Sequence, residues 1–230
     1  NVLNRKNLVA CVAMEYSATP GLNLNGGGIA QPYVKFLTFA PSGTLIASVN
    51  LDARGEKYMP GACVVCHGAS GYSRYSEVPG GSSPAMEAQF LPFDLNNFKF
   101  AANTGPLSQA GQEANFANLN GFIAYGPGAS SARPALKELI AGWYNNVSNT
   151  FNNLFVPPGW VGHEALYNDV VKENCRSCHV AMPAAFDSYG SFAAYSPLIA
   201  SHVCGYKANE LNPRKLWSMP NAKVTFDKFW

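Results

Sequence analysis

The sequence predicts an α+β protein that is mainly helical, with a β-hairpin region near the N-terminus and much irregular loop. Hydrophobic residues make up 47% of the 230 positions, which is enough for a packed core. The 21 glycines and 16 prolines favour long irregular segments over a helix bundle or a regular sandwich. A β-rich beginning and two later segments with helical spacing account for the mixed class.

The low charge of the chain excludes several classes of protein. Charged residues make up 13% of the sequence and the net charge is +2, without a basic stripe. A nucleic-acid-binding protein carries clustered positive charge, so we exclude this class. No run of about 18 apolar residues occurs, so we expect no transmembrane helix.

The N-terminal part of the chain has the pattern of short strands. Residues 8–17 alternate loosely between apolar and polar, and residues 33–39 are rich in β-forming side chains. The turn residues 41–44 separate that run from another apolar run at 45–51, which predicts a hairpin between the two. Residues 56–61 end in a proline and a glycine, so we expect no helix before the cysteine that follows.

The later segments are expected to be loops and helices. Residues 68–108 have loop composition, and residues 109–124 have the pattern of a weak helix. Residues 132–144 follow helical spacing more clearly. After a loop at 145–158, a helix is expected to begin at Gly162 and to run directly into a second cysteine pair.

Four of the six cysteines and two of the four histidines fall into two motifs of the form C-x-x-C-H. Their residues are Cys63, Cys66 and His67 in the first motif, and Cys175, Cys178 and His179 in the second. By chance, this composition would contain roughly 0.003 such motifs. Residues three apart share a helical face, so both thiols can reach the two vinyl groups of one haem. The histidine that follows then ligates the iron, which predicts two covalently bound haem c groups.

Two other chemistries use paired cysteines. A zinc site with four cysteine ligands would use both pairs but would leave the adjoining histidines unexplained. A thioredoxin-like redox pair requires a βαβ context that this sequence lacks. Covalent haem accounts for every residue of both motifs, so it is the interpretation that we adopt.

Covalent haem attachment also predicts the compartment. Because haem is attached outside the cytoplasmic membrane, we expect a periplasmic or extracellular protein of a bacterium or archaeon. The two remaining cysteines, Cys11 and Cys204, fit that oxidising setting as a disulfide. The alternative is that Cys204 is a thiolate ligand of an iron, which leaves Cys11 unexplained.

Residues 162–230 resemble a class I c-type cytochrome domain. A helix leads into the second motif, Met219 follows in a later loop, and a short aromatic segment ends the sequence. The resemblance implies His179 as proximal and Met219 as distal ligand, and it covers less than a third of the chain. We expect a β-rich region at 1–125 with the first haem site, and a helical, cytochrome c-like domain at 126–230 with the second.

The distal ligands leave several alternatives. For the second haem, His202 is the rival of Met219. For the first haem we favour Met14, because the β segment that contains it has no other evident purpose. Met86, His163 and an open distal site are the alternatives.

Two haems in one small chain favour electron transfer between redox proteins, which requires only ligated irons and exposed haem edges. A dihaem redox enzyme, of the peroxidase or thiosulfate dehydrogenase type, would need an open or displaceable distal site. A third alternative is a subunit of an extracellular cytochrome assembly or filament, in which the N-terminal strand pairs with a neighbour's sheet. We expect an electron carrier rather than an enzyme.

Overall fold

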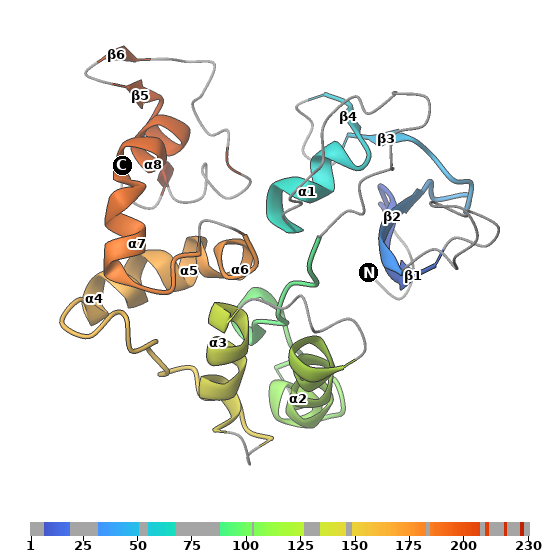
Figure 1. Ribbon diagram of the computed structural model, residues 1–230. Coiled ribbons are helices and arrows are strands. Elements are labelled where there is room, and N and C mark those ends of the chain that lie inside the picture. The colour runs from blue at the N-terminus through green and yellow to red at the C-terminus, as the bar shows by residue number, and fades with distance from the viewer. Residues whose placement is uncertain are drawn as a thin grey trace, which may run out of the picture. The chain divides into compact units, whose positions relative to one another are not determined.

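The computed structural model divides the chain into two compact units, Asn1–Gln89 and Phe90–Trp230. Figure 1 shows their helices and strands. The structure describes residues 7–18, 32–50, 55–67, 88–102, 104–126, 134–145, 149–182, 185–207, 210–211, 219 and 226–227. The boundary differs from the one expected after residue 125. The helix α2 (Gln109–Tyr125) packs against α3 (Pro134–Tyr144), and it therefore belongs to the second unit.

Within its described residues, the first unit consists of two small antiparallel sheets and one helix. The elements are β1 (Cys11–Ser17), β2 (Tyr33–Phe39), β3 (Ser48–Val49), β4 (Lys57–Tyr58) and α1 (Gly61–His67). Alternate residues of a strand point to one face, so Val34, Phe36 and Thr38 share a face of β2. Val34 and Thr38 are buried, which identifies this face as the inner one.

The expected strands form, but one of them pairs with a different partner. β2 pairs along its whole length with β1, whereas the prediction paired it with residues 45–51. The turn at 41–44 is present: the Gly43 amide donates to the Ala40 carbonyl at 2.8 Å, and Gly43 has a φ of +88°. After this turn only one bridge, Phe39 to Leu45, links the returning chain to β2. The chain then leaves the sheet, and its next strand, β3, pairs with β4 instead.

The helix α1 begins at Gly61, the glycine of the Pro60–Gly61 pair that was expected to prevent a helix before the first cysteine. The expectation is confirmed for the strand β4 but is wrong for Gly61 and Ala62, which are helical and precede Cys63, because a proline is tolerated at the start of a helix. The helix itself starts at Gly61, and its seven residues carry the entire first motif. The first motif therefore lies on a short helix of its own rather than at the end of a longer one.

The second unit contains a hydrophobic core around α3. Leu136, Leu139, Ile140 and Trp143 are all buried, as their helical spacing predicted. They pack with residues from the segments on both sides of α2 and α3, including Leu95 and Val180. A single packed cluster thus connects the segment before α2 with the segment after the second motif.

A second core in this unit lies beside the helical path that leads to the second motif. The path consists of α4 (Glu164–Leu166), the π-helical turn η3 (Tyr167–Val171), α5 (Lys172–Asn174) and α6 (Arg176–His179). Cys175 interrupts it with a φ of −122°. The core consists of Trp160, Tyr167, Val171 and Phe186, all buried. The predicted helix into the second motif is therefore confirmed, with a break at its first cysteine.

Two helices that the sequence analysis did not predict follow the second motif. They are α7 (Tyr189–Ala194) and α8 (Ser196–Cys204), followed by the strands β5 (Tyr206–Lys207) and β6 (Glu210–Leu211). Gly205 ends α8 with a φ of +74°, a left-handed conformation that glycine adopts without strain. The described part of the region between the second motif and Met219 therefore contains two helices and two short strands.

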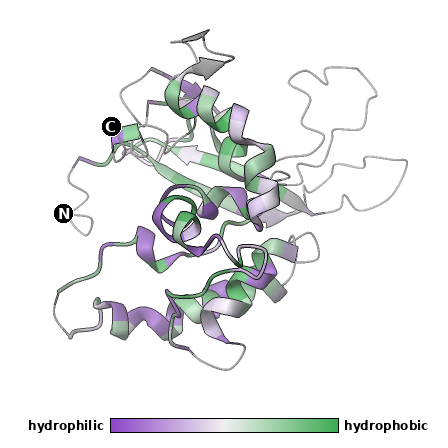
Figure 2. Cartoon of the chain, turned by 90° about the vertical axis from the view of Figure 1, so that its left-hand side faces the viewer, coloured by the Kyte–Doolittle hydropathy of each residue, from purple (hydrophilic) through white to green (hydrophobic). Residues whose placement is uncertain are grey.

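The fold class is α+β, with helices and small antiparallel sheets. Figure 2 shows hydrophobic and hydrophilic residues mixed along the helices. In the part of the chain that the structure describes, no helix combines the length and the hydropathy that a membrane crossing requires.

The buried side chain of Asn120 tests how the second unit is held together. Asn120 accepts a hydrogen bond from the Phe93 amide at 2.8 Å and donates to the Phe93 carbonyl at 2.9 Å. We expect Asn120→Ala to lower the free energy of unfolding by about 2–3 kcal/mol, because both backbone groups lose a buried partner.

All four tryptophans belong to the second unit, so urea unfolding followed by tryptophan fluorescence reports this unit. The control is Asn118→Ala on the exposed face of the same helix, which should change stability by less than about 0.5 kcal/mol. Equal effects of the two variants would show that the Asn120 contacts do not stabilise the unit.

Candidate functional site

The first motif lies on α1, which presents its two cysteines one helical turn apart. Cys63 and Cys66 are both partly buried, and His67 is the last residue of the helix. Residues three apart on a helix share a face, so both thiols are available to one flat group bound beside α1. The structure therefore places Cys63, Cys66 and His67 within two turns of one helix.

His67 is held in one orientation by the backbone of Gln89. Its Nδ1 atom lies 2.8 Å from the Gln89 carbonyl oxygen, and the Gln89 amide donates to the His67 carbonyl at 3.0 Å. Because a carbonyl only accepts, Nδ1 carries the proton and Nε2 keeps its lone pair. Metal-ligating histidines commonly have this arrangement, which fixes the ring and leaves Nε2 to bind iron.

The surroundings of the first motif are apolar and sulfur-rich. Burial lowers the pKa of His67, and the bond to the Gln89 carbonyl opposes this effect. The ring of Phe36 lies 5.3 Å from the ring of His67. The Sγ atom of Cys63 lies 3.2 Å from the Sδ atom of Met59. Burial, and then the charge of neighbouring Cys66, raises the pKa of Cys63.

Met14, the predicted distal ligand of the first haem, lies directly opposite Phe36 in the β1–β2 sheet. Opposed residues of an antiparallel pair point to the same face, so Met14 shares the face of Phe36, whose ring contacts His67. Met14 is partly buried. The structure thus places Met14 on the sheet face from which Phe36 contacts His67 of the first motif.

The second motif begins at the break between α5 and α6. Cys175 precedes α6, and Cys178 and His179 lie on it. Burial raises the pKa of Cys175 to about 12. The ring of His179 stacks on Phe186, with 3.8 Å between ring centroids and 7° between planes. Because Phe186 belongs to the second core, the imidazole is oriented by packing.

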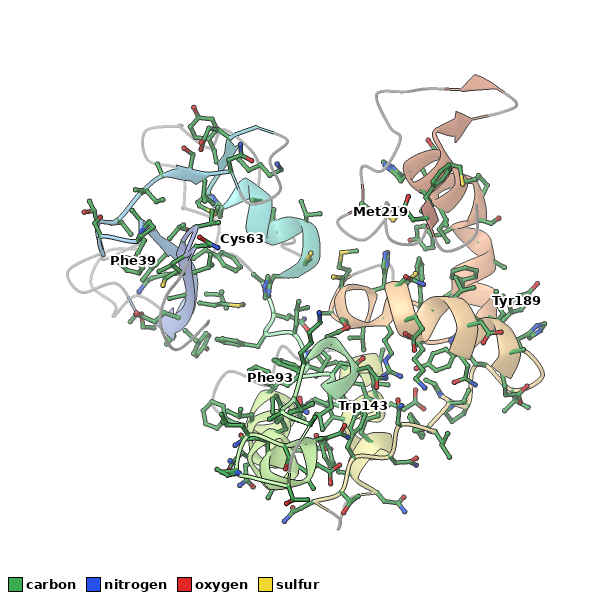
Figure 3. All side chains as sticks on the ribbon, turned by 180° about the vertical axis from the view of Figure 1, so that it is seen from behind. Phe39, Cys63, Phe93, Trp143, Tyr189 and Met219 are labelled. Carbon is green, nitrogen blue, oxygen red and sulfur yellow. The ribbon has the colours of Figure 1, made fainter. Side chains whose placement is uncertain are left out.

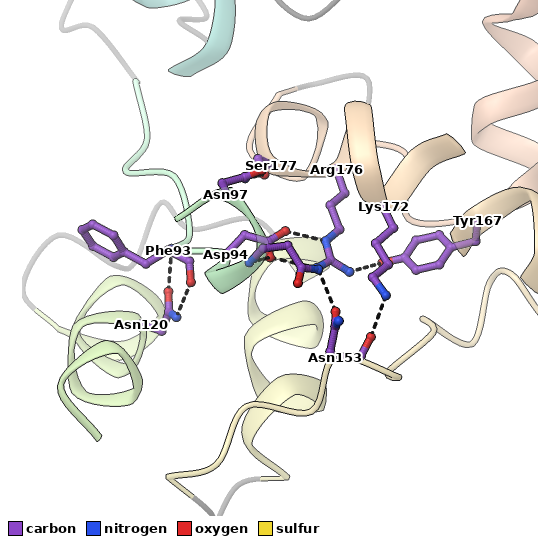
Figure 4. A network of polar contacts seen from close by, with 10 residues as sticks. Phe93, Asp94, Asn97, Asn120, Asn153, Tyr167, Lys172, Arg176 and Ser177 are labelled. Atoms are coloured by element: carbon purple, nitrogen blue, oxygen red, sulfur yellow. Dashed lines mark hydrogen bonds and ion pairs between the residues drawn. The ribbon is translucent and has the colours of Figure 1, made fainter. Parts of the chain in front are cut away.

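The two residues between the cysteines of the second motif have polar partners. Arg176 forms a bidentate ion pair with Asp94, with 2.7 Å from Nε to Oδ2 and 2.9 Å from Nη2 to Oδ1. Both side chains are almost fully buried, at 3% and 1% exposed. Asn97 donates to the hydroxyl of Ser177 at 2.7 Å. Figure 4 shows these contacts converging on the motif from one short turn.

Two aromatic side chains complete the environment of Arg176. Its guanidinium lies 5.0 Å from the ring of Trp143, at the distance of a cation–π contact. It also donates to the hydroxyl of Tyr167 at 3.5 Å. Burial is the largest single effect on the pKa of Arg176 and lowers it. The hydrogen bonds and the charge of Asp94, together with the contact with Tyr167, outweigh burial, so the pKa of Arg176 is raised. The guanidinium of Arg176 therefore contacts a carboxylate, a hydroxyl group and an aromatic ring.

A small cavity of about 20 Å³ adjoins this network. Arg176, Tyr167 and Phe186 are among its lining residues. This volume is that of a single water molecule, so it does not form a substrate pocket.

The remaining candidate ligands have different positions. Met219, which is labelled in Figure 3, is a partly buried residue of the second unit, and His202 is partly buried on α8. His163 is exposed and stacks on Tyr189 at 3.5 Å between ring centroids. Met86 lies outside the described residues.

The disulfide expected between Cys11 and Cys204 does not form in this structure. None of the six cysteines is in a disulfide. Cys11 is exposed on β1 in the first unit, and Cys204 is the last residue of α8 in the second unit. The expectation rested on the compartment predicted from the haem motifs, and a compartment does not decide which cysteines meet in the fold.

Haem is compatible with the residues present at the first motif. In the described part of the chain, no group of three or more His, Cys, Asp or Glu side chains is arranged to hold a bare metal ion. A haem brings its own ring of ligands, so the protein needs to supply only thiols for attachment and axial ligands. The oriented imidazole of His67 and the two thiols one turn apart on α1 meet that requirement.

Sequence reasoning identified the motifs but missed the residues that hold them. Gln89 acts through its backbone, which leaves no signal in residue type. Asp94 had a weak signal, because an acidic residue between Phe93 and Leu95 is unusual in an apolar segment of a chain with few charges. Arg176 inside the motif is the complementary charge.

Phe186 offers a test of the packing that orients His179. We expect Phe186→Ala to lower the free energy of unfolding of the second unit by about 3–5 kcal/mol, because a buried ring is replaced by a cavity. Phe122→Ala is the control, since Phe122 is 63% exposed and should contribute less than about 0.5 kcal/mol. Urea unfolding followed by tryptophan fluorescence measures both. A change of less than about 1 kcal/mol for Phe186→Ala would contradict its role as a core residue.

Comparison with known proteins finds no relative of this chain. No protein-family model matches the chain, and no curated protein or solved structure matches it either. The two C-x-x-C-H motifs and the contacts that surround them are therefore the features that indicate a function.

Proposed function

We propose that this protein is a dihaem c-type cytochrome that carries electrons between redox partners outside the cytoplasm. The observation that carries the proposal is the arrangement of the first motif. Two thiols lie one helical turn apart, and the Nδ1 proton of the next residue, His67, is bound by the Gln89 carbonyl. The second motif repeats the same residue spacing on a helical path of the second unit.

Each residue of the motifs has a distinct role in this proposal. Each haem, when bound, supplies an iron that accepts and releases one electron. Cys63 and Cys66 form thioethers with one haem, and His67 provides its proximal ligand through Nε2. Cys175, Cys178 and His179 do the same in the second unit. Apolar packing around the imidazoles limits access of water, which raises a reduction potential.

The distal ligands belong to the same proposal. Met219 is the distal ligand of the second haem, which agrees with the resemblance of residues 162–230 to a class I cytochrome domain. Met14 is the distal ligand of the first haem, and its support is that it shares a sheet face with Phe36 beside His67. Methionine ligation gives a haem a higher potential than histidine ligation does.

The number of haems tests the proposal directly. We expect the full chain, produced together with a c-type haem attachment system, to carry two covalent haems by mass spectrometry and by the pyridine haemochrome spectrum. C63A/C66A and C175A/C178A should each lose one haem, because each motif binds its own. Cys11→Ser is the control and should keep both. A wild-type chain without covalent haem would overturn the proposal.

Carbon monoxide then distinguishes a carrier from an enzyme in the same preparation. If both irons are ligated on both faces, the spectrum of the reduced protein stays unchanged when carbon monoxide is added. A change in half of the haem signal would instead reveal an open distal site and would favour a redox enzyme.

A ligand substitution tests the assignment of Met219. We expect Met219→His to lower the reduction potential of one haem only, because an imidazole replaces the thioether at that iron. A spectroelectrochemical titration resolves the two haems. Met182→Leu is the control, since Met182 lies three residues after His179 and is placed too close along the chain to reach the other face. Equal shifts of both haems, or no shift, would reject the assignment.

A further inference from the structure

One short turn binds both of the residues that lie between the cysteines of the second motif, which we call its variable residues. Asp94 and the helical turn η1 (Leu95–Asn97) form this segment, which we call the 94–97 turn. Asp94 binds Arg176, and Asn97 binds Ser177. Asp94 Oδ1 also accepts from the Asn96 amide at 3.2 Å, which caps the turn and orients the carboxylate. The turn is therefore built to present two polar side chains to the motif.

These contacts are unexpected from the chemistry of haem attachment. The thioethers and the axial ligand use only the two cysteines and the histidine, so the residues between the cysteines are free to vary. In the first motif they are Val64 and Val65, which have no polar side-chain atoms. In the second motif, a buried arginine would be costly unless its charge were compensated. The ion pair therefore serves a purpose that covalent attachment does not require.

We propose, on the basis of the function proposed above, that the 94–97 turn positions the second haem-attachment motif and that the Asp94–Arg176 pair sets the charge beside that haem. Asp94 and Asn97 are positioning residues, because they act on the haem through Arg176 and Ser177. The turn keeps α6 against the core of the second unit. The paired carboxylate cancels the positive charge that Arg176 brings into the motif.

The charge of the pair has a predictable effect on reduction. Oxidised haem iron carries one more positive charge than reduced iron. An uncompensated Arg176 disfavours the oxidised state, so removing the Asp94 charge raises the potential of the second haem. An uncompensated Asp94 favours the oxidised state, so removing the Arg176 charge lowers it. Removing both charges returns the potential toward that of the wild type.

This sign pattern defines the experiment. Asp94→Asn, Arg176→Gln and D94N/R176Q are compared with wild type by spectroelectrochemical titration of the two-haem protein. We expect an upward shift, a downward shift and a near-wild-type value for the second haem, with the first haem unchanged as the internal reference. Asp169→Asn, at an exposed site in the same unit, is the charge control and should shift neither haem. Shifts of the same sign for both single variants, or no shift, would overturn the proposal.

A milder variant keeps the proposal testable if the charge variants do not fold. Asn97 is exposed and contributes a single hydrogen bond to the motif, so Asn97→Ala is not expected to unfold the chain. We expect incomplete haem attachment at the 175–179 peptide, with full attachment at 63–67, measured by peptide mass spectrometry. Asn96→Ala, which removes a neighbouring exposed side chain that does not contact the motif, is the matched control.

The outcomes separate this inference from the proposed function. Full attachment at both motifs in Asn97→Ala would overturn the positioning role while leaving the cytochrome proposal intact. A wild-type chain without haem would overturn the cytochrome proposal and this inference together. Selective loss at the second motif supports both.

Discussion

The buried ion pair between Asp94 and Arg176 is the contact on which the second unit depends. It joins residues that are 82 positions apart, and both side chains are almost fully buried. A buried charge is strongly destabilising without its partner, so each residue requires the other. Trp143 from one core and Tyr167 from the other both contact the same guanidinium. One charged group therefore links the two cores and the second motif.

The two motifs share their chemistry but differ in how they are held. His67 is oriented by the backbone of Gln89 and faces Phe36, and the variable residues of its motif are valines. The second motif is held through its variable residues, and His179 stacks on a buried ring. If each motif binds a haem, as proposed, the two haems would have unequal potentials, because the environment of a haem sets its potential.

The positions of two helices were predictable from the local sequence pattern, although the buried residues of α2 are Asn120 and Ala124, and Phe122 is 63% exposed. The segments expected at 109–124 and 132–144 form α2 and α3 with bounds that differ by at most two residues. Strand pairing was not predictable in the same way. β2 pairs with β1 across an intervening segment, because register depends on which strand packs against it rather than on which follows next. The predicted boundary between the units differs from the observed one for a similar reason. The prediction placed α2 in the first unit by its position in the sequence, whereas its contact with α3 places it in the second.

The sequence by itself determined the α+β fold class and the spacing of the residues in the two motifs. Two thiols and an imidazole on one helical turn are a local property, because their spacing alone decides which face they share. The tertiary structure decided which residues hold those groups. The Gln89 carbonyl lies 22 positions from His67, and Asp94 lies 82 from Arg176. Only the tertiary fold brings such distant groups within hydrogen-bonding distance. Burying a polar or charged group without its partner is unfavourable in free energy, so both members of each pair are required.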